Sequence, residues 1–342
     1  MMAEYLGVGI VGPGWVAGEH INAFHRNPHT RVVAICGRTE EKARRLKEAK
    51  GLEDCQVYSD YEKMLEQADL DIVSICTPNH RHAKEGILAA KAGKHMLVEK
   101  PAAITLESLH ALEEGVRKAQ VKALVGFETR WSPLLEIIKS LQEADAIGSV
   151  FYAEVDYRSG MLAGWYPGFD WSRKIATGGS SFLVAGCHAI DAMRWLVGSE
   201  AVEVTAYSGG WDRRYEYDAT SVAIIKFENG TVGKSLSSIE LNMPYGFNIE
   251  LYGDKGTIIN RKLYSLSLMK GQTDFAEIPC IGPESSDVRY HPFQPEMDHL
   301  VDCILNDKEP MVNMPDAVKT HEICIAADIS AAENRPVKLP LR

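Results

Sequence analysis

Residues 5–17 read Y-L-G-V-G-I-V-G-P-G-W-V-A, and this stretch decides the fold of the first half of the chain. The apolar run 5–11 has the length and composition of a buried β-strand, and it ends in glycine. The next six residues open a helical pattern. Gly12-Pro13-Gly14-Trp15-Val16-Ala17 therefore fits G-x-G-x-x-[GA] between a strand and a helix, which is the setting that a dinucleotide fingerprint requires.

Each small residue of this loop has a physical task. Gly12 permits the tight turn, Gly14 lets the backbone approach a pyrophosphate, and Ala17 lets the helix pack on the strand. The helix N-terminus supplies N–H groups and a positive dipole end. The alternative is a plain strand-to-helix turn. The residues expected to contact a dinucleotide here are Gly12, Pro13, Gly14, Trp15 and Val16.

The rest of the first half repeats the same alternation. Further β-branched runs of strand length lie at 31–36, 71–76, 95–98 and 121–126, with helical patterns between them. Continuous apolar strands separated by helices imply a buried parallel sheet. We therefore predict an α/β Rossmann domain, a doubly wound parallel sheet, over residues 1–127.

The second half has a different pattern. Residues 149–157 alternate as an antiparallel strand does, and turn signals separate the runs that follow. We predict an α+β domain with a mostly antiparallel sheet over 128–342. Its expected strands lie at 202–208, 219–227, 231–238, 246–253, 256–260 and 263–270, and its closing helices near 294–306 and 315–333.

Composition narrows the class of protein. A chain of 342 residues fits two domains, and a net charge of −10 argues against nucleic acid as a partner. No apolar run approaches membrane-spanning length, and no secretory signal is evident, so no membrane partner is expected. The seven cysteines are scattered without a C-x-x-C pair, so no metal site is expected and the cytoplasm is the expected compartment.

The end of the second strand bears on cofactor choice. An NAD enzyme usually has a carboxylate there for the ribose 2′-hydroxyl, but this chain has Gly37-Arg38-Thr39. A guanidinium can bind a 2′-phosphate bidentately. We expect Gly37, Arg38 and Thr39 to bind the cofactor, with NADP preferred to NAD. The alternatives for Arg38 are stacking on adenine or a solvated surface position.

Two further segments follow strands at the carboxyl edge, where ligands bind in such sheets. Thr77, Pro78 and Asn79 follow the strand at 71–76, and His82 lies in the same C-T-P-N-H-R-H segment; turn and N-cap chemistry is the alternative reading. Glu99 and Lys100, in E-K-P, follow the strand at 95–98. A lysine there can donate to a substrate hydroxyl and shuttle a proton, whereas a surface ion pair with Glu99 is the alternative.

These motifs, in this order and spacing, resemble the Gfo/Idh/MocA oxidoreductases, which include glucose–fructose oxidoreductase and inositol dehydrogenase. The resemblance continues through G-G-S at 178–180, H-A-I-D at 188–191 and E-N-R-P-V at 333–337, and so covers nearly the whole chain. It implies that Lys100 and His188 are catalytic. It also implies that Arg173, two residues after Trp171, lies near the cofactor, although a serine intervenes in the W-R pair.

The spacing of His188 and Asp191 places them on one face of a helix, so Asp191 is expected to orient His188 or stabilise its charge. One position departs from the family pattern: many relatives have an aspartate four residues before the histidine, and this chain has Val184. Lys100 and His188 then suffice, or another residue substitutes, or the reaction differs. The candidate substitutes are Tyr157, Tyr166 and His291.

The sequence thus predicts an NAD(P)-dependent oxidoreductase that transfers a hydride between nicotinamide and a sugar, polyol or keto-sugar. The resemblance implies that the second domain binds substrate and that the protein is a homodimer or homotetramer. Two alternatives remain at this point. One is an NAD-dependent glycosidase that acts through transient oxidation, and the other is a non-catalytic dinucleotide-binding protein.

Overall fold

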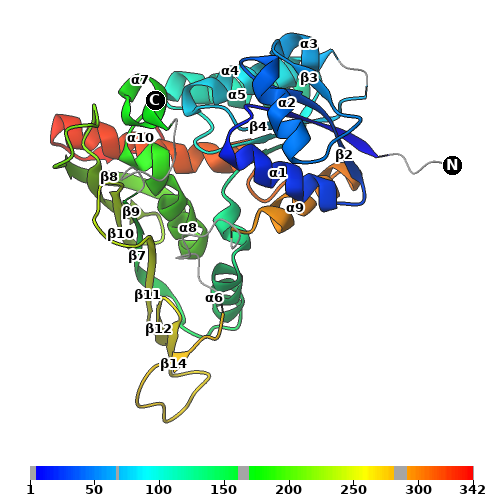
Figure 1. Ribbon diagram of the computed structural model, residues 1–342. Helices are drawn as coiled ribbons and strands as arrows, with labels where there is room; N and C mark the ends of the chain where they lie inside the picture. Colours follow the sequence, from blue (N-terminus) through cyan, green and yellow to red (C-terminus); the bar gives the residue numbers. More distant parts are fainter. Residues whose placement is uncertain (1–4, 67–68, 161–168, 281–290, 342) are drawn as a thin grey trace. The chain divides into compact units, whose positions relative to one another are not determined.

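The structure, a computed structural model of the chain, describes residues 5–66, 69–160, 169–280 and 291–341. The chain forms two compact units, each with its own sheet (Figure 1). The first comprises Met1–Gly126 and Phe293–Val318, and the second Phe127–Pro292 and Lys319–Arg342.

The first unit is built on a six-stranded sheet in the order β3-β2-β1-β4-β5-β6, with every neighbouring pair parallel. The strands are β1 Leu6–Val11, β2 Thr30–Cys36, β3 Gln56–Tyr58, β4 Ile72–Ile75, β5 His95–Val98 and β6 Ala123–Val125. The central strands are buried along almost their whole length, as strands covered on both faces must be. The predicted α/β Rossmann fold is confirmed. The three-residue β3 carries no apolar run and was not predicted.

Six helices of the described ranges pack in this unit, and all but the last of them connect one strand to the next. They are α1 Trp15–Arg26, α2 Glu40–Ala49, α3 Tyr61–Leu65, α4 Asn79–Lys91, α5 Leu106–Ala119 and α9 Phe293–Leu305. Side-chain caps fix three of the starts: Thr39, Asp60 and Thr105 each accept a hydrogen bond from a backbone N–H of the first turn. None of the helices in the described ranges is long and apolar enough to cross a membrane.

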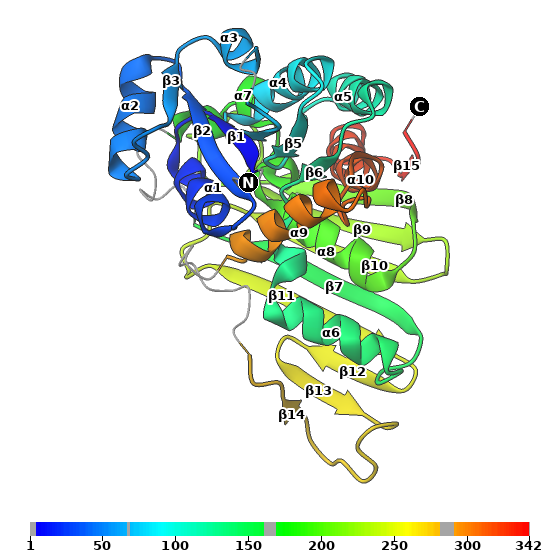
Figure 2. The same cartoon turned by 90° about the vertical axis from the view of Figure 1, so that its right-hand side faces the viewer.

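Helix α9 belongs to the first unit although it comes late in the chain. It lies along α1 (Figure 2), where the Phe293 ring packs against His20 at 5.5 Å between centroids. Gln294 donates to the carbonyl of Ala23 at 3.1 Å. The sequence pattern predicts one domain over 128–342, and the structure differs because this helix carries the complementary surface for α1. Periodicity alone cannot show which unit a helix joins.

The second unit is built on a nine-stranded sheet in the order β14-β13-β12-β11-β7-β10-β9-β8-β15. Among the strand pairs of the described residues only β7–β10 is parallel, so the predicted mostly antiparallel α+β architecture is confirmed. The strands are β7 Val150–Arg158, β8 Ala201–Gly209, β9 Thr220–Phe227, β10 Val232–Ser238, β11 Gly246–Gly253, β12 Gly256–Ile259, β13 Lys262–Ser265, β14 Ala276–Glu277 and β15 Val337–Lys338.

One predicted strand is shorter than its alternating sequence suggested. Residues 263–270 were expected to continue as a strand, but β13 ends at Ser265. The hydroxyl of Ser265 accepts a hydrogen bond from the N–H of Leu268, and its carbonyl accepts one from Met269. These two local bonds turn the chain, and they outweigh the alternating pattern.

Helices cover one face of this sheet. Figure 2 shows α8, Cys187–Val197, over the face of β7 and β10, with α6, Pro133–Glu143, beside it. The buried Ala153, Val155 and Tyr157 of β7 point to that side, and the intervening residues point to the other. Shorter helical segments are η1 Glu128–Trp131, η2 Asp170–Arg173, α7 Ile175–Gly178 and the π-helical η3 Phe182–Gly186; the long α10, Met314–Glu333, runs from the first unit into the second.

Candidate active-site residues

The glycine loop of the first unit has the geometry of a dinucleotide cradle. Gly12 adopts φ +87°, and a Cβ there would lie 2.7 Å from the backbone of Cys76, so only glycine fits. Gly14, the N-cap of α1, has no side-chain cap, and a Cβ there would meet no atom closer than 3.9 Å. The loop therefore leaves open space before the start of a helix, where a pyrophosphate fits. Trp15 is half exposed beside it.

The packing around Gly37 explains why no carboxylate follows β2. A Cβ at Gly37 would lie 2.9 Å from Cγ of Pro13 and 3.0 Å from the carbonyl oxygen of Thr39. A longer side chain would have to displace the glycine loop. The next residue, Arg38, is exposed, and the Thr39 side chain caps α2 by accepting from the N–H of Lys42. An exposed cation, Arg38, therefore follows β2, and position 37 carries no carboxylate.

The segment after β4 is held by buried polar contacts. Pro78 is the N-cap of α4, Asn79 is its buried first residue, and the Thr77 hydroxyl donates to Glu85. The buried ring of His82 lies 2.8 Å from the carbonyl oxygen of Pro101 through Nδ1 and also contacts the carbonyl of Thr77 through Nε2. Burial lowers the pKa of His82, and the two carbonyls offset only part of that effect. His82 thus ties the loops after β4 and β5 together.

Lys100 follows β5 directly, at the same edge of the sheet as the glycine loop. Glu99 does not pair with it as a surface ion pair would. One carboxylate oxygen of Glu99 lies 3.0 Å from Nε2 of the fully buried His20, and the other accepts the backbone N–H of Lys100 at 3.2 Å. Burial lowers the pKa of His20, but contacts with Cys76 and Glu99 outweigh it and raise that pKa well above its ordinary value. The pair anchors the backbone at Lys100.

The second unit positions the predicted histidine. The π-helical η3 leads into α8, and His188 is the second residue of that helix, only 5% exposed. Tyr157 of β7 lies nearly parallel to the His188 ring at 6.2 Å between centroids, and Phe127 meets it edge-on at 5.9 Å. Two aromatic rings therefore fix the plane of the imidazole.

Asp191 does not orient His188, which corrects the expectation from helical spacing. Its carboxylate forms a bidentate ion pair with Arg130, with Nε to Oδ2 at 2.7 Å and Nη2 to Oδ1 at 2.6 Å. The hydroxyl of Thr320 donates to the same oxygen Oδ1 at 3.0 Å. The pair is buried, and the Asp191 carboxylate is fully occupied by these partners.

Glu128 is the carboxylate that faces His188, and sequence reasoning missed it. Its Oε2 lies 3.7 Å from Nδ1 of His188, and its Oε1 lies 3.1 Å from Nδ1 of His291. The side chain is 4% exposed. The available signal was a charged pair, Glu128 and Arg130, inside an otherwise apolar segment after the last Rossmann strand.

The remaining expected positions have defined surroundings. Val184 is buried in η3, and its N–H donates to the carbonyl of Ser180. Of the proposed substitutes for an acid there, Tyr157 contacts His188 and His291 contacts Glu128, whereas Tyr166 lies outside the described residues. Arg173 lies in η2, where Nη1 donates to Asp170 at 3.1 Å.

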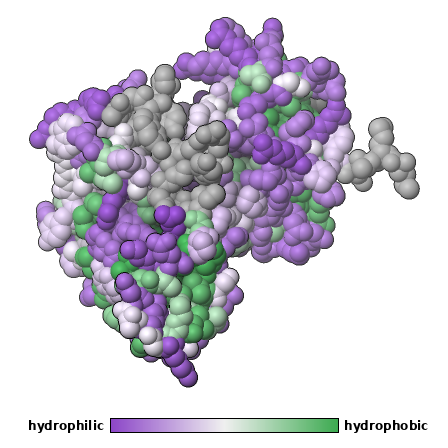
Figure 3. Space-filling view, turned by 60° about the horizontal axis from the view of Figure 1, so that its bottom comes forward, coloured by the Kyte–Doolittle hydropathy of each residue, from purple (hydrophilic) through white to green (hydrophobic). Residues whose placement is uncertain are grey.

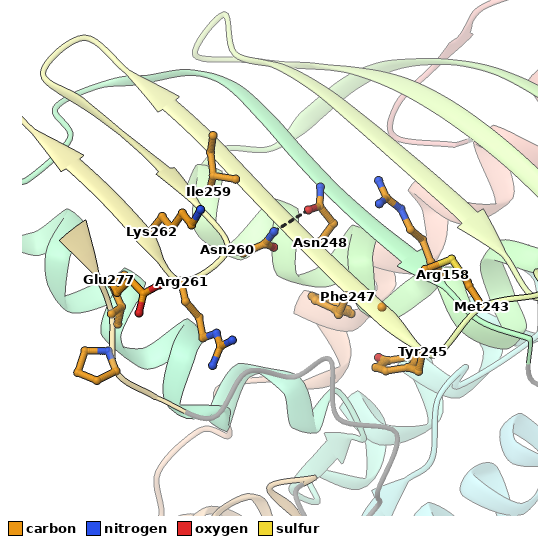
Figure 4. A pocket seen from close by; sticks show the side chains of 13 residues that line it. Arg158, Met243, Tyr245, Phe247, Asn248, Ile259, Asn260, Arg261, Lys262 and Glu277 are labelled. Atoms are coloured by element: carbon orange, nitrogen blue, oxygen red, sulfur yellow. Dashed lines mark hydrogen bonds between the residues drawn. The ribbon is translucent and has the colours of Figure 1, made fainter. Parts of the chain in front are cut away.

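A pocket of about 540 Å³ lies elsewhere in the second unit, at the β11–β13 end of the sheet (Figure 4). Arg158, Arg261 and Lys262 line it together with Asn248 and Asn260, which are joined by a hydrogen bond of 2.9 Å. It contains none of the residues expected to bind cofactor or to react. We therefore do not assign the chemistry to it.

A parallel sheet with a glycine-rich dinucleotide cradle and a lysine at its carboxyl edge defines a nucleotide-dependent oxidoreductase. Comparison with known families agrees. Residues 6–127 match the model described as "Oxidoreductase family, NAD-binding Rossmann fold", and residues 139–339 match its "C-terminal alpha/beta domain". The chain belongs to the Gfo/Idh/MocA oxidoreductase family.

Individual relatives are distant but match over most of their length. The chain is 30% identical to scyllo-inositol 2-dehydrogenase (NAD(+)) of Bacillus subtilis, over 97% of this chain and 96% of that protein. It is 27% identical to D-apiose dehydrogenase of Paraburkholderia graminis, over 96% and 88%. A solved structure of levoglucosan dehydrogenase with NADH superimposes with a TM-score of 0.90 at 24% identity, over 99% of this chain and 100% of that one, which shows the shared fold.

Proposed function

We propose that this oxidoreductase transfers a hydride between a nicotinamide dinucleotide and a sugar, polyol or keto-sugar. The observation that carries the proposal is the position of Lys100, directly after β5, at the sheet edge that also holds the open space before Gly14. The relatives named for inositol and apiose oxidation support this class of substrate.

A bound dinucleotide supplies the hydride acceptor or donor, and the chain supplies binding and proton transfer. The Gly12–Gly14 backbone and the N-terminus of α1 hold the pyrophosphate, with the residues after β2 and β4 around the rest of the molecule. Lys100 gives or takes the proton of the reacting hydroxyl or carbonyl, and His188 of the second unit is the second proton-transfer group. His20 and Glu99 hold the backbone from which Lys100 extends.

NADP is the proposed preferred form of the cofactor. Gly37 excludes the carboxylate that would repel a 2′-phosphate, and Arg38 offers the exposed cation that would bind it. The solved structure of levoglucosan dehydrogenase contains NADH, and this favours the opposite expectation, a preference for NAD. Comparing the affinities of NADPH and NADH decides between them.

The second unit, Phe127–Pro292 and Lys319–Arg342, is proposed to bind substrate and to form a homodimer or homotetramer. The sheet face opposite α8 exposes Tyr207, Ile224 and Val232, three large apolar side chains on the adjacent strands β8, β9 and β10. Figure 3 shows hydrophobic areas among hydrophilic residues on one face of the molecule. Apolar surface of this kind favours a contact between copies. The pattern of cysteines supports the cytoplasm as the compartment.

The test is a screen of sugars, polyols and keto-sugars for a change in NAD(P)H fluorescence. A dehydrogenase gives net formation or consumption of reduced cofactor with at least one of them. Substrate cleavage without net cofactor turnover would instead identify a glycosidase that acts by transient oxidation. Cofactor binding without any turnover across the screen would identify a dinucleotide-binding protein and would overturn the proposal.

A further inference from the structure

Val184, four residues before His188, can neither transfer a proton nor carry a charge, yet a buried carboxylate does face His188. Glu128 comes from the short helix η1 at the start of the unit, far from α8 in sequence. Its carboxylate lies between two imidazoles, 3.7 Å from Nδ1 of His188 and 3.1 Å from Nδ1 of His291.

We propose that Glu128 is the positioning and charge-stabilising partner of His188, and that it takes the place of the missing acid at position 184. This inference rests on the proposed function, because it assigns a role within the same proton-transfer site.

The geometry indicates how Glu128 acts. A separation of 3.7 Å is too long for a hydrogen bond but is an ion-pair distance when His188 carries a proton. His291 donates its Nδ1–H to the other carboxylate oxygen and thereby fixes the orientation of the carboxylate. The charge on Glu128 then favours the imidazolium form of His188 over the neutral form.

The surroundings strengthen this coupling. Glu128 and His188 are both almost completely buried, so water screens their interaction weakly. Tyr157 and Phe127 pack against the ring and restrict its rotation. The Nδ1 edge faces Glu128, so the opposite edge, Nε2, is the one that exchanges a proton with a substrate oxygen.

Asp191 is also a buried acid and lies three residues after His188, but it cannot stabilise the charge of His188 in this way. Both of its carboxylate oxygens are bound by Arg130, and one also accepts from Thr320. An arginine-paired carboxylate has its charge already balanced, so Asp191 stabilises an added proton on His188 only weakly.

The decisive measurement is the pH titration of the His188 ring, followed by NMR of the ¹³C-labelled full-length chain without substrate. The signal is assigned by its loss in His188→Gln. Glu128→Gln is expected to lower the proton affinity of His188 by about tenfold or more, because an opposite charge within a few ångströms is removed. Glu136→Gln is the matched control: it removes an exposed carboxylate of α6 and should leave the titration unchanged.

Glu128→Asp keeps the charge but withdraws it by one methylene, so the proton affinity should lie between those of the wild type and Glu128→Gln. If Glu128→Gln does not fold, the proton affinity of His188 in Glu128→Asp alone tests the proposal. A His188 titration that is the same in the wild type, Glu128→Asp and Glu128→Gln would overturn the proposal.

The kinetic counterpart uses any substrate found in the screen. The limb of the kcat/KM pH profile that reports His188 should move to lower pH in Glu128→Gln by the same factor as the NMR titration, with partial restoration in Glu128→Asp. A screen without turnover would overturn the proposed function and leave the titration test intact. A shifted titration with an unshifted kinetic profile would overturn the catalytic relevance of Glu128.

Discussion

Arg130 and Asp191 form a bidentate ion pair in the interior of the second unit, with both side chains almost completely buried. The pair joins η1 to α8, and Thr320 of α10 donates to the same carboxylate. It therefore links three segments that are distant in sequence. The pair holds α8 in place, and α8 in turn carries His188.

Removing one partner of this pair should destabilise the protein strongly. Asp191→Asn leaves the Arg130 guanidinium buried without its counter-charge, which typically costs about 3–5 kcal/mol. The double variant Arg130→Met/Asp191→Leu should recover a large part of that loss, because no buried charge is then left unpaired. Urea unfolding monitored by fluorescence measures both. A single variant as stable as the wild type would show that the pair is not a stabilising link.

Arg38 should decide between the two forms of the cofactor. Loss of a charge-assisted contact with a phosphate costs about 1.5–3 kcal/mol, so Arg38→Ala should weaken NADPH binding on the order of tenfold to a hundredfold. NADH binding should change little. Arg44→Ala is the control, since Arg44 is an exposed arginine of α2 that pairs with Glu40. Tighter binding of NADH than of NADPH by the wild type would contradict the assignment.

Lys100→Ala should abolish most turnover and preserve cofactor binding. General acid–base groups contribute on the order of a hundredfold to ten-thousandfold in rate, and the backbone at Lys100 stays anchored by Glu99 and His20 in the variant. The measurement is kcat on the substrate found in the screen, with NAD(P)H titration as the folding check. Lys91→Ala, at the exposed end of α4, is the control. Turnover near the wild-type value in Lys100→Ala would refute proton transfer by this lysine.

The contrast between His188 and Val184 tests the second half of the site. His188→Ala should reduce kcat by at least about a hundredfold. Val184→Ala removes only apolar volume from a buried position, so it should mainly lower the free energy of unfolding, by about 1–3 kcal/mol. A rate that falls more steeply in Val184→Ala than in His188→Ala, with both variants folded, would make His188 a core residue instead.

Local patterns explain how much of the fold could be predicted. The parallel sheet follows from apolar runs such as 71–76, whose neighbours and turn residues agree with the strand assignment. Prediction fails where a local hydrogen bond competes with the hydrophobic pattern. Ser265 accepts such a bond and turns the chain in the middle of an alternating run. The assignment of α9 to the first unit depends on its contact with α1, which periodicity does not encode.

The residues of the candidate site also differ in how far the sequence alone predicts them. Lys100 and His188 stand in short motifs with fixed neighbours, so the sequence points to both. Glu128 could not be identified in this way, because its proposed role depends on contacts with His188 and His291, which lie far along the chain. The sequence next to Glu128 resembles a buried core segment. Asp191 shares a helical face with His188, as predicted, but the arginine that binds it comes from η1. Helical spacing shows which residues are adjacent and cannot show which partner a buried charge selects.

Asp328 of α10 gives the second unit a dependence of stability on pH. Burial raises the pKa of its carboxyl from 3.8 to about 7, and a hydrogen bond from Ser180, in the glycine-rich segment 178–180, offsets part of that rise. Tyr217 and Cys324, which interact electrostatically with Asp328, stay neutral in this range because burial raises the pKa of each. The folded chain therefore binds the Asp328 proton more tightly than the unfolded chain does.

Because the folded-state pKa is the higher one, the stabilisation from protonated Asp328 is complete below about pH 4 and is lost as the pH rises through 7. Asn resembles the protonated carboxyl and does not titrate, so Asp328→Asn should become more stable relative to the wild type between pH 4 and pH 8, by at most about 4 kcal/mol. Urea unfolding at both pH values measures this difference, and Asp274→Asn, at an exposed position, should show none. A difference between the wild type and Asp328→Asn that is constant across this range would mean that Asp328 is ionised in the folded protein throughout. The Ser180 hydroxyl would then be donating to a carboxylate, and the glycine-rich segment that leads into α8 would be held by a charge instead of a neutral acid.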